Sequence, residues 1–239
     1  MRVTTTVAAT TAATLAVNAA PAVTSLGPLR RRWFPGLAGI GCGPSVGLTF
    51  DDGPDPASTP AFLDALDDLG WKATFFMLGR MVRRSPGLAA SVAAAGHEVA
   101  VHGDSHRSHG WRSPADVGAD LERATATVLE ATGVRPTWFR PPYGVLSVGS
   151  VVAARQLELR PVLWTTWGRD WRARATADSV AADVTRGLRP GGTVLLHDSD
   201  CTSAPGAWRS ALGCLPALAD VFAAQGLQAQ RLGSHLQVR

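Results

Sequence analysis

From residue 43 onward, short runs of β-branched and aromatic residues alternate with longer stretches rich in Ala and Leu. The short runs have the length and composition of buried strands, and the stretches between them are typical of helices. Because parallel neighbouring strands need a crossover, which a helix supplies, this alternation predicts a parallel sheet. The predicted strands are Val46 to Asp52, Lys72 to Leu78, His97 to His102, Pro136 to Arg140, Arg160 to Trp167, Thr193 to Asp198 and Gln228 to Leu232.

The number of these units indicates how the sheet closes. Seven strand-helix units, without a Gly-x-Gly-x-x-Gly run after the first strand, favour a barrel or incomplete barrel over a dinucleotide-binding sheet. A chain of 239 residues with 46% hydrophobic content is long enough for one sizeable core. We therefore expect an α/β fold with one domain over residues 43–239, preceded by an N-terminal tail over residues 1–42.

The N-terminal tail resembles a weak secretory signal. Its first 24 residues are rich in Ala and Thr, and small residues at Ala19, Ala20 and Ala22 are suited to a cleavage site. The basic run Arg30 to Arg32 follows closely, which suits a cytoplasmic flank instead. We expect an extracellular or cell-wall location, with the cytoplasm as the alternative, and no membrane span after this segment.

Charge and cysteine content exclude several kinds of site. The net charge of +4 comes almost wholly from Arg, and no basic run alternates with aromatic residues, so no nucleic-acid partner is expected. Without a Cys-x-x-Cys pair, a cysteine metal site is excluded. Cys201 and Cys214 either pair in an oxidising compartment, leaving Cys42 free, or all three are separate thiols.

Two adjacent carboxylates, Asp51 and Asp52, end the first predicted strand and are followed by the turn residues Gly53 and Pro54. Side chains alternate across a strand, so neighbouring acids share one environment only if the strand end turns both toward a common object. A cation is such an object, because two carboxylates this close otherwise repel each other. A solvated turn is the alternative interpretation.

The other reactive side chains also follow the ends of predicted strands. The carboxyl ends of parallel strands in a barrel form one face, where such enzymes place their sites. His102 and His106 are four residues apart, and Gly103 allows the chain to turn so that both rings lie on one side. Together with Asp52, they form a candidate three-ligand metal site that leaves positions open for water and substrate.

Five ordered motifs resemble those of the polysaccharide deacetylases, also known as the NodB-homology or carbohydrate esterase family 4 enzymes. The motifs are Thr49-Phe50-Asp51-Asp52-Gly53-Pro54, His102-x-x-x-His106, Arg140-Pro141-Pro142-Tyr143-Gly144, Asp170-Trp171 and Leu195-Leu196-His197-Asp198. The resemblance covers about Val46 to Gln228. It implies a distorted (β/α)7 barrel of the NodB-homology type, a divalent metal and removal of acetyl groups from N-acetylated sugars.

The resemblance also implies roles for the residues around the metal. Asp52, His102 and His106 would be the ligands of Zn²⁺, or of another divalent transition metal such as Co²⁺. Asp51 would be the general base that takes a proton from the attacking water. Arg140 would pair with Asp51 and keep this base ionised and oriented.

The remaining motif residues would complete the site on the substrate side. The backbone N–H of Tyr143 would help to stabilise the tetrahedral oxyanion. His197 would be the general acid that protonates the departing amine, with Asp170 holding it charged. Trp171 and Leu195 would form the wall of the pocket around the acetyl methyl group.

One position departs from the family pattern. The fourth motif usually begins with another Asp three residues before Asp170, and Trp167 occupies that place here. This change places the hydrogen-bond network behind Asp170 in doubt and gives a substrate wall a different shape. Asp104 and Ser105 occupy the variable middle of the second motif and receive no ligand role.

We therefore expect a monomeric metal-dependent hydrolase that releases acetate from a glycan containing N-acetylglucosamine, either peptidoglycan or a chitin-like oligomer. Three alternatives remain open. The substrate could be an O-acetyl ester of the xylan type, or the barrel could bind metal and sugar without catalysis. His102-x-Asp104 also has the local spacing of a non-haem iron site, although that class expects a mostly β fold.

Overall fold

The structure is a computed structural model that describes residues 17–237, and its strands form one curved parallel sheet. The strand order is β5-β4-β3-β2-β1-β7-β6, with β8 paired to the first residues of β1. The strands are β1 (Ser45–Asp51), β2 (Thr74–Met77), β3 (Glu98–Val101), β4 (Trp138–Phe139), β5 (Arg160–Pro161), β6 (Thr166–Trp167), β7 (Thr193–His197) and β8 (Gln228–Gln230). The edges β5 and β6 are not paired with each other, so the described residues form a half-barrel.

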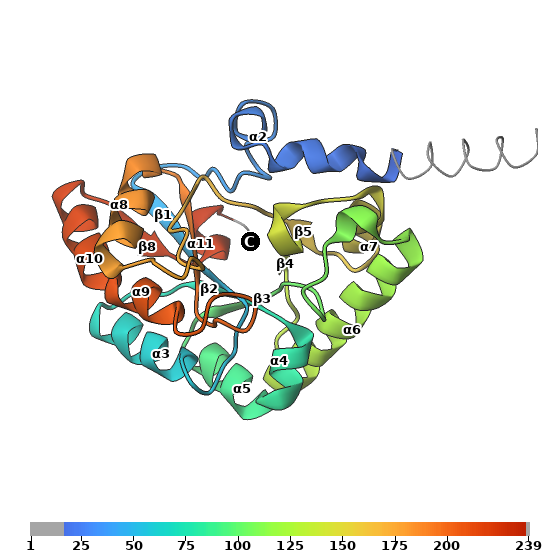
Figure 1. Ribbon diagram of the computed structural model, residues 1–239, viewed down its shortest axis with the longest axis horizontal. Coiled ribbons are helices and arrows are strands. Elements are labelled where there is room, and N and C mark those ends of the chain that lie inside the picture. Colours follow the sequence, from blue (N-terminus) through green and yellow to red (C-terminus); the bar gives the residue numbers. More distant parts are fainter. Residues whose placement is uncertain (1–16, 238–239) are drawn as a thin grey trace, which may run out of the picture.

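Helices surround this half-barrel on its outer side. Figure 1 shows them as an incomplete ring, with α2 at the opening between α7 and α8. The α-helices are α2 (Gly27–Trp33), α3 (Thr59–Asp68), α4 (Gly79–Arg84), α5 (Pro86–Ala94), α6 (Pro114–Thr132), α7 (Val148–Gln156), α8 (Ala177–Gly187), α9 (Trp208–Gly213), α10 (Leu215–Ala224) and α11 (Leu232–His235). Short 3-10 helices are η1 (Ala20–Ser25), η2 (His109–Trp111) and η3 (Pro142–Gly144). The prediction of a distorted (β/α)7 barrel is confirmed.

The predicted strand from Arg160 to Trp167 is wrong as a single element, because the chain changes partner strands within it. The backbone N–H of Val162 donates to the carbonyl oxygen of Phe139 in β4, whereas that of Thr165 donates to the carbonyl oxygen of Thr193 in β7. Residues 162–167 are all apolar, aromatic or β-branched, so their composition contains no signal of this change. The residues between the two pairings cross the open side of the half-barrel and bring Trp164 there.

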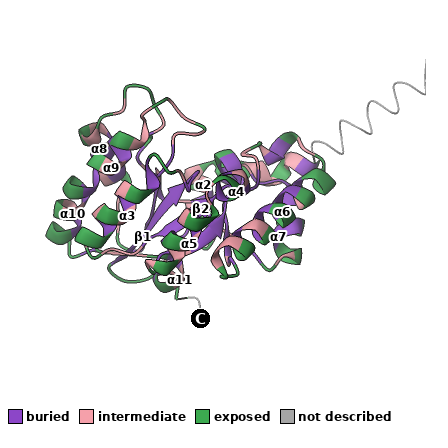
Figure 2. Ribbon diagram, turned by 90° about the horizontal axis from the view of Figure 1, so that it is seen from below, coloured by how far each residue is buried: buried purple, intermediate pink, exposed green. Residues whose placement is uncertain are grey.

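The strand β1 lies inside the sheet, between β2 and β7, and is buried along its whole length. Within the core, the ring of Phe50 contacts Phe62 of α3 and Phe75 of β2, with centroids 5.1 and 5.2 Å apart. Figure 2 shows the buried sheet between helices whose outer faces are exposed. Burying each such ring stabilises the fold by roughly 1.5–3 kcal/mol, so the strand that carries the paired acids is rigidly held.

The N-terminal segment, residues 18–41, packs against the open side of the half-barrel. Leu163 donates its backbone N–H to Leu37 at 2.7 Å, and Gly41 donates to Gly191 at 2.9 Å. These contacts join residues before the predicted domain boundary at residue 43 to the sheet that follows it. The boundary itself stays a prediction. The predicted signal includes residues 1–16, which lie outside the described part of the chain. Within residues 17–237, no helix is long and apolar enough to span a bilayer.

The three cysteines are free thiols in different surroundings. Cys42 is exposed, Cys201 is half-buried, and Cys214 is buried in the core. The pairing of Cys201 with Cys214 is therefore not formed. Instead, the Sγ of Cys201 lies 3.6 Å from the backbone carbonyl oxygen of Asp52.

Candidate active site

The turn after β1 brings the paired acids into one space. Asp52 has a φ of 82°, a left-handed conformation that is uncommon for a residue other than Gly. Gly53 is required next, because a Cβ there would collide with the carboxylate of Asp198, which accepts the Gly53 N–H at 3.1 Å. Asp51 and Asp52 are both almost completely buried, so the interpretation as a solvated turn is wrong.

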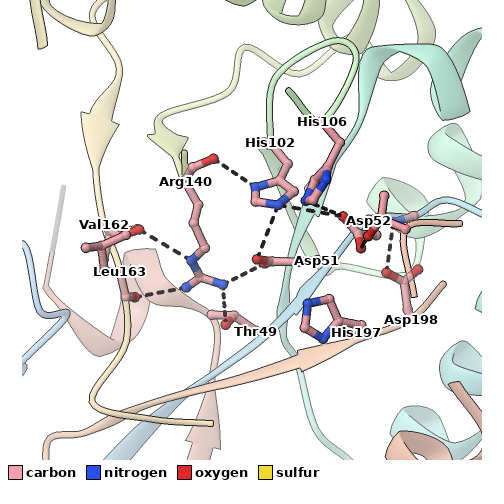
Figure 3. Close-up of polar contacts among 12 residues, drawn as sticks. Thr49, Asp51, Asp52, His102, His106, Arg140, Val162, Leu163, His197 and Asp198 are labelled. Carbon is pink, nitrogen blue, oxygen red and sulfur yellow. Dashed lines mark hydrogen bonds and ion pairs between the residues drawn. The ribbon is translucent and has the colours of Figure 1, made fainter. Parts of the chain in front are cut away.

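A candidate metal site lies beside this turn. The Nε2 atoms of His102 and His106 lie 3.6 and 3.5 Å from Oδ1 of Asp52, and all three candidate ligand atoms lie within 4.8 Å of one another. That Oδ1 is buried and has no hydrogen-bond partner among residues 17–237, which is costly for a carboxylate oxygen. Figure 3 shows both imidazoles pointing toward Asp52. Two imidazoles and one carboxylate fit a divalent transition metal.

The two imidazoles are prepared to act as ligands. The Nδ1 of His102 lies 2.8 Å from the carbonyl oxygen of Arg140, which fixes that nitrogen as the N–H donor and leaves Nε2 with a lone pair. Burial and the neighbouring His102 lower the pKa of His106 to about 4, so His106 is neutral near pH 7. Burial opposes ionisation of Asp52, but nearby His197, His102 and His106 outweigh it and hold the pKa of Asp52 below its usual range.

A buried acid that the sequence analysis missed, Asp120, supports the loop between the two histidines. Its carboxylate accepts the Asp104 N–H at 2.7 Å, the Ser105 hydroxyl at 2.9 Å and the Arg112 guanidinium at 3.0 Å. The signal was present in the pattern of α6. Asp120 follows Val117 by three residues and therefore occupies the helix face that is otherwise buried and apolar.

Asp51 is held by Arg140 on the side away from the metal site. Oδ1 of Asp51 accepts a hydrogen bond from the fully buried guanidinium at 2.6 Å, and Oδ2 lies 3.6 Å from Nε2 of His102. The guanidinium also donates to Thr49 and to the carbonyl oxygens of Val162 and Leu163. Because Arg140 bonds to both the first strand and the open side, it fixes the carboxylate of Asp51 in one orientation.

His197 lines the cavity and is paired with Asp170, which lies behind it. One carboxylate oxygen of Asp170 lies 2.9 Å from Nδ1 of His197, and the other accepts its backbone N–H at 2.7 Å. Burial alone would lower the pKa of His197, but the carboxylates of Asp170, Asp52 and Asp51 outweigh it and raise this pKa to about 10. His197 is therefore an imidazolium near neutral pH.

The predicted site residues surround one cavity of about 320 Å³. Those that line it are Asp51, His102, His106, Tyr143, Trp171, Leu195 and His197. The remaining three, Asp52, Arg140 and Asp170, lie behind these residues and contact them. Tyr143 is largely exposed, and its ring packs against that of His106 with centroids 4.7 Å apart. The structure thus brings all ten predicted residues together.

Four cavity-lining residues had no predicted role there, namely Gly144, Trp164, Thr202 and Ser203. Thr202 donates its hydroxyl hydrogen to Oδ2 of Asp52, which leaves the other oxygen of that carboxylate facing the imidazoles. Trp164 lies in the segment predicted as strand and reaches the cavity because that strand is split. Trp167, the residue that departs from the family pattern, also lines the cavity.

The alternative of a non-haem iron site with Asp104 is contradicted. The carboxylate of Asp104 makes two hydrogen bonds to Arg83, at 2.6 and 3.0 Å. It is not part of the cluster formed by Asp52, His102 and His106, and the fold is α/β rather than mostly β.

The sequence pattern of the family described as polysaccharide deacetylase matches residues 39–162, just over half of the chain. The chain belongs to the polysaccharide deacetylase family. Its enzyme class is therefore that of metal-dependent deacetylases, hydrolases that act on amide bonds. The match ends beside β5, so the motifs around Asp170 and His197 lie beyond it.

Two curated relatives extend this assignment. The chain is 38% identical to a chitooligosaccharide deacetylase of Bradyrhizobium over 155 residues, which cover 64% of this chain and 70% of that protein. It is 36% identical to the peptidoglycan-N-acetylglucosamine deacetylase PgdA of Listeria monocytogenes over 159 residues, which cover 66% of this chain. The second match spans only 33% of the longer Listeria protein.

Solved structures of the same family share the fold. The peptidoglycan N-acetylglucosamine deacetylase Bc1960 has a TM-score of 0.79 and 26% identity, covering 87% of this chain and 96% of its own. A family pseudoenzyme from Bacillus anthracis has a TM-score of 0.73 and 26% identity, covering 81% of this chain and 66% of its own. The fold is therefore compatible with both active and inactive members, and the side chains of the site decide between them.

Proposed function

We propose that this protein removes N-acetyl groups from a glycan that contains N-acetylglucosamine, either peptidoglycan or a chitin-like oligomer, and releases acetate. One observation carries the proposal. A carboxylate, Asp51, and an imidazolium, His197, face the same cavity beside the cluster of Asp52, His102 and His106. Amide hydrolysis needs a base for water and an acid for the departing amine, and a sugar-binding module needs neither.

Asp51 acts as the general base in this proposal. Its Oδ1 is bound to Arg140, so the proton of the attacking water goes to the other oxygen, Oδ2. The short hydrogen bond from the guanidinium prevents the carboxylate from rotating away. In this proposal, the backbone N–H of Tyr143, a residue that lines the cavity, helps to stabilise the resulting tetrahedral oxyanion.

His197 acts as the general acid. Its Nδ1 is engaged by Asp170, so the proton leaves from Nε2 and passes to the sugar nitrogen as the carbon-nitrogen bond breaks. The products are acetate and a free amine. The carboxylate of Asp170 keeps the imidazole oriented and charged, which meets the need for a protonated acid at neutral pH. Trp171 and Leu195 enclose the acetyl methyl group.

We assign Asp52, His102 and His106 as the ligands of the family's divalent metal. Zinc is the proposed ion, because neutral imidazoles and a carboxylate are its usual ligands, and cobalt is the alternative. When bound, the ion would polarise the acetyl carbonyl and lower the pKa of a bound water toward about 7. The unpartnered Oδ1 of Asp52 supports this assignment.

We further propose that the protein acts as a monomer, outside the cell or at the cell wall. Light scattering of the purified protein tests the oligomeric state. Cell fractionation tests the location, and a protein found only in the cytoplasm would contradict this part of the proposal.

The test of the function is acetate release from N-acetylglucosamine oligomers and from peptidoglycan fragments, with acetylated xylan alongside. We expect release from the first two by zinc-loaded protein and none after chelation. Release only from acetylated xylan would replace the amide substrate with an ester. If zinc binds, the fold is intact and no substrate releases acetate, the protein is a silent binding barrel.

A further inference from the structure

Three tryptophans form a continuous row along one wall of the cavity. Trp171 lies next to the acid, with its ring 5.9 Å from that of His197. The ring of Trp167 is 4.7 Å from Trp171, and the ring of Trp164 is stacked on Trp167 at 5.5 Å with 28° between their planes. All three are half-buried and line the cavity. The row therefore continues beyond the residues assigned to the acetyl group.

The outer end of this row is fixed by the N-terminal segment. Arg30 of α2 is 3% exposed, and its guanidinium donates to the carbonyl oxygens of Thr24 and Trp164, both at 2.8 Å. The same guanidinium lies 5.4 Å from the indole ring of Trp164. Burying an arginine is costly, and here bonds that join α2 to the cavity wall offset part of that cost. Arg30 thus holds Trp164 from outside the sheet.

The opposite edge of Trp164 is also confined. A Cβ at Gly144 would lie 2.8 Å from the tip of the Trp164 indole, so the ring is in close contact with the backbone of this glycine. The guanidinium of Arg140 lies 5.7 Å from the same indole. Trp164 is therefore packed between α2 and the Arg-Pro-Pro-Tyr-Gly motif. An indole that is fixed in this way loses little entropy when a ligand covers it.

A wall of indole faces is suited to a particular kind of ligand. The face of an aromatic ring carries partial negative charge, and the C–H bonds on one face of a pyranose ring present partial positive charge to it. Guanidinium groups already lie near these rings, those of Arg30 and Arg140 at 5.4 and 5.7 Å from Trp164 and that of Arg169 at 5.6 Å from Trp167, so the apolar ring surface left to a ligand suits a neutral sugar. A cavity of about 320 Å³ has the volume of a small-molecule site and therefore admits a sugar unit rather than a folded polymer.

We propose that Trp164 and Trp167 form a stacking subsite for a pyranose ring of the substrate, and that Arg30 is a positioning residue for this subsite. The proposal rests on the proposed function for the identity of the substrate. It assigns a role to Trp167, which stands where the family motif has Asp. It also makes residues of the N-terminal segment part of the substrate-binding unit.

The direct test is the binding of N-acetylglucosamine tetramer to the chelated protein, in which turnover is stopped, measured by calorimetry. We expect Trp167→Ala to weaken binding about five- to tenfold, the size of a lost stacking contact. Trp167→Phe should retain part of the affinity, whereas Trp167→Leu, which keeps the apolar volume without the ring, should behave like Trp167→Ala. The matched control is Trp33→Ala, since Trp33 lies on α2 and is 64% exposed.

The positioning role of Arg30 has its own control in Arg32, an exposed residue of the same helix whose guanidinium lies 5.0 Å from the ring of Trp33. We expect Arg30→Ala to raise KM for the tetramer several-fold with kcat unchanged, and Arg32→Ala to leave both constants unchanged. A general loss of folding would lower kcat as well. Circular dichroism of each variant shows whether it is folded. If Arg30→Ala is not folded, Arg30→Lys replaces it in the same measurement.

The outcomes separate this proposal from the proposed function. Tetramer binding that depends on Trp167, without any acetate release, would support the subsite and overturn the deacetylase. Acetate release with the same KM in wild type and Trp167→Leu would support the deacetylase and overturn the subsite. Failure of the wild-type protein to bind the tetramer would also overturn the subsite.

Discussion

The carboxyl ends of the strands, which form the rim of the half-barrel, and the open side between β5 and β6 are built in different ways. At the rim, side chains at the ends of the strands hold one another, as Arg140 holds Asp51 and Asp170 holds His197. At the open side, the wall of the cavity is held by Arg30, which belongs to a helix outside the sheet. In our proposal, the rim carries the groups that break the bond, and the open side carries the aromatic surface that contacts substrate. Chemistry and substrate selection are therefore separable, and variants in the two regions should fail in different ways.

The largest effect is expected from His106→Ala at the rim. Loss of one of three proposed ligands should remove most bound zinc and reduce acetate release to the level of a chelated sample. Elemental analysis after dialysis measures the zinc content. His97→Gln is the control, since His97 precedes β3 and lies at the opposite end of that strand. A His106→Ala protein that kept full zinc and full activity would contradict the metal assignment.

The next effect is expected from Asp170→Asn, which should reduce kcat about 10²-fold. It should also change the pH profile. His197 must be protonated to act as an acid, so activity falls as pH rises past its pKa, which the Asp170 charge helps to raise to about 10. Removing that charge lowers this pKa and moves the alkaline limb of kcat to lower pH. Asp183→Asn, which removes an acid paired with Arg172 and Arg186 on α8, should leave the profile in place.

A smaller effect is expected from Thr202→Val. The hydroxyl of Thr202 fixes one oxygen of Asp52, and its loss should weaken zinc binding about tenfold, as is typical for groups that orient a metal ligand. Competition with a coloured chelator measures the zinc affinity. Ser203→Ala changes the neighbouring residue of the same cavity and should leave this affinity unchanged. Equal zinc affinity in Thr202→Val and wild type would remove Thr202 from the site.

The smallest effect on chemistry is expected from Asp120→Asn, which should act on stability instead. Losing charged hydrogen bonds to the loop should cost about 1.5–3 kcal/mol of unfolding free energy at pH 7. Burial opposes ionisation of Asp120, but the Asp104 N–H and the Arg112 and Ser105 side chains outweigh it and lower its pKa. This contribution is therefore present above the unfolded-state pKa of about 3.9 and is lost as pH falls through the lower folded-state value.

Urea unfolding at pH 7 and at acidic pH measures this difference. The exposed Glu122 lies on the same helix, and Glu122→Gln should leave the unfolding free energy unchanged. If Asp120→Asn were as stable as wild type at pH 7, Asp120 would not be the support of the histidine loop.

The two regions also differed in how far the sequence predicted them. The rim was predictable because its residues follow strands whose ends meet on one face of a parallel barrel. The open side was not, because Trp164 lies among aromatic and β-branched residues that are typical of one strand. The partner change between Val162 and Thr165 depends on hydrogen bonds to distant strands. The contacts of Arg30 were likewise not predictable, because the basic run Arg30 to Arg32 resembles the flank of a signal segment.

The central claim is that Asp51 is the base of a zinc-dependent amide hydrolysis. The most direct measurement compares acetate release from N-acetylglucosamine tetramer by zinc-loaded wild type and Asp51→Asn, with zinc content and tetramer affinity determined on both. We predict equal zinc content, similar tetramer affinity and a rate about 10²- to 10⁴-fold lower in the variant. An equal rate of release at equal zinc content would contradict the account, because the proton of the attacking water would then go elsewhere.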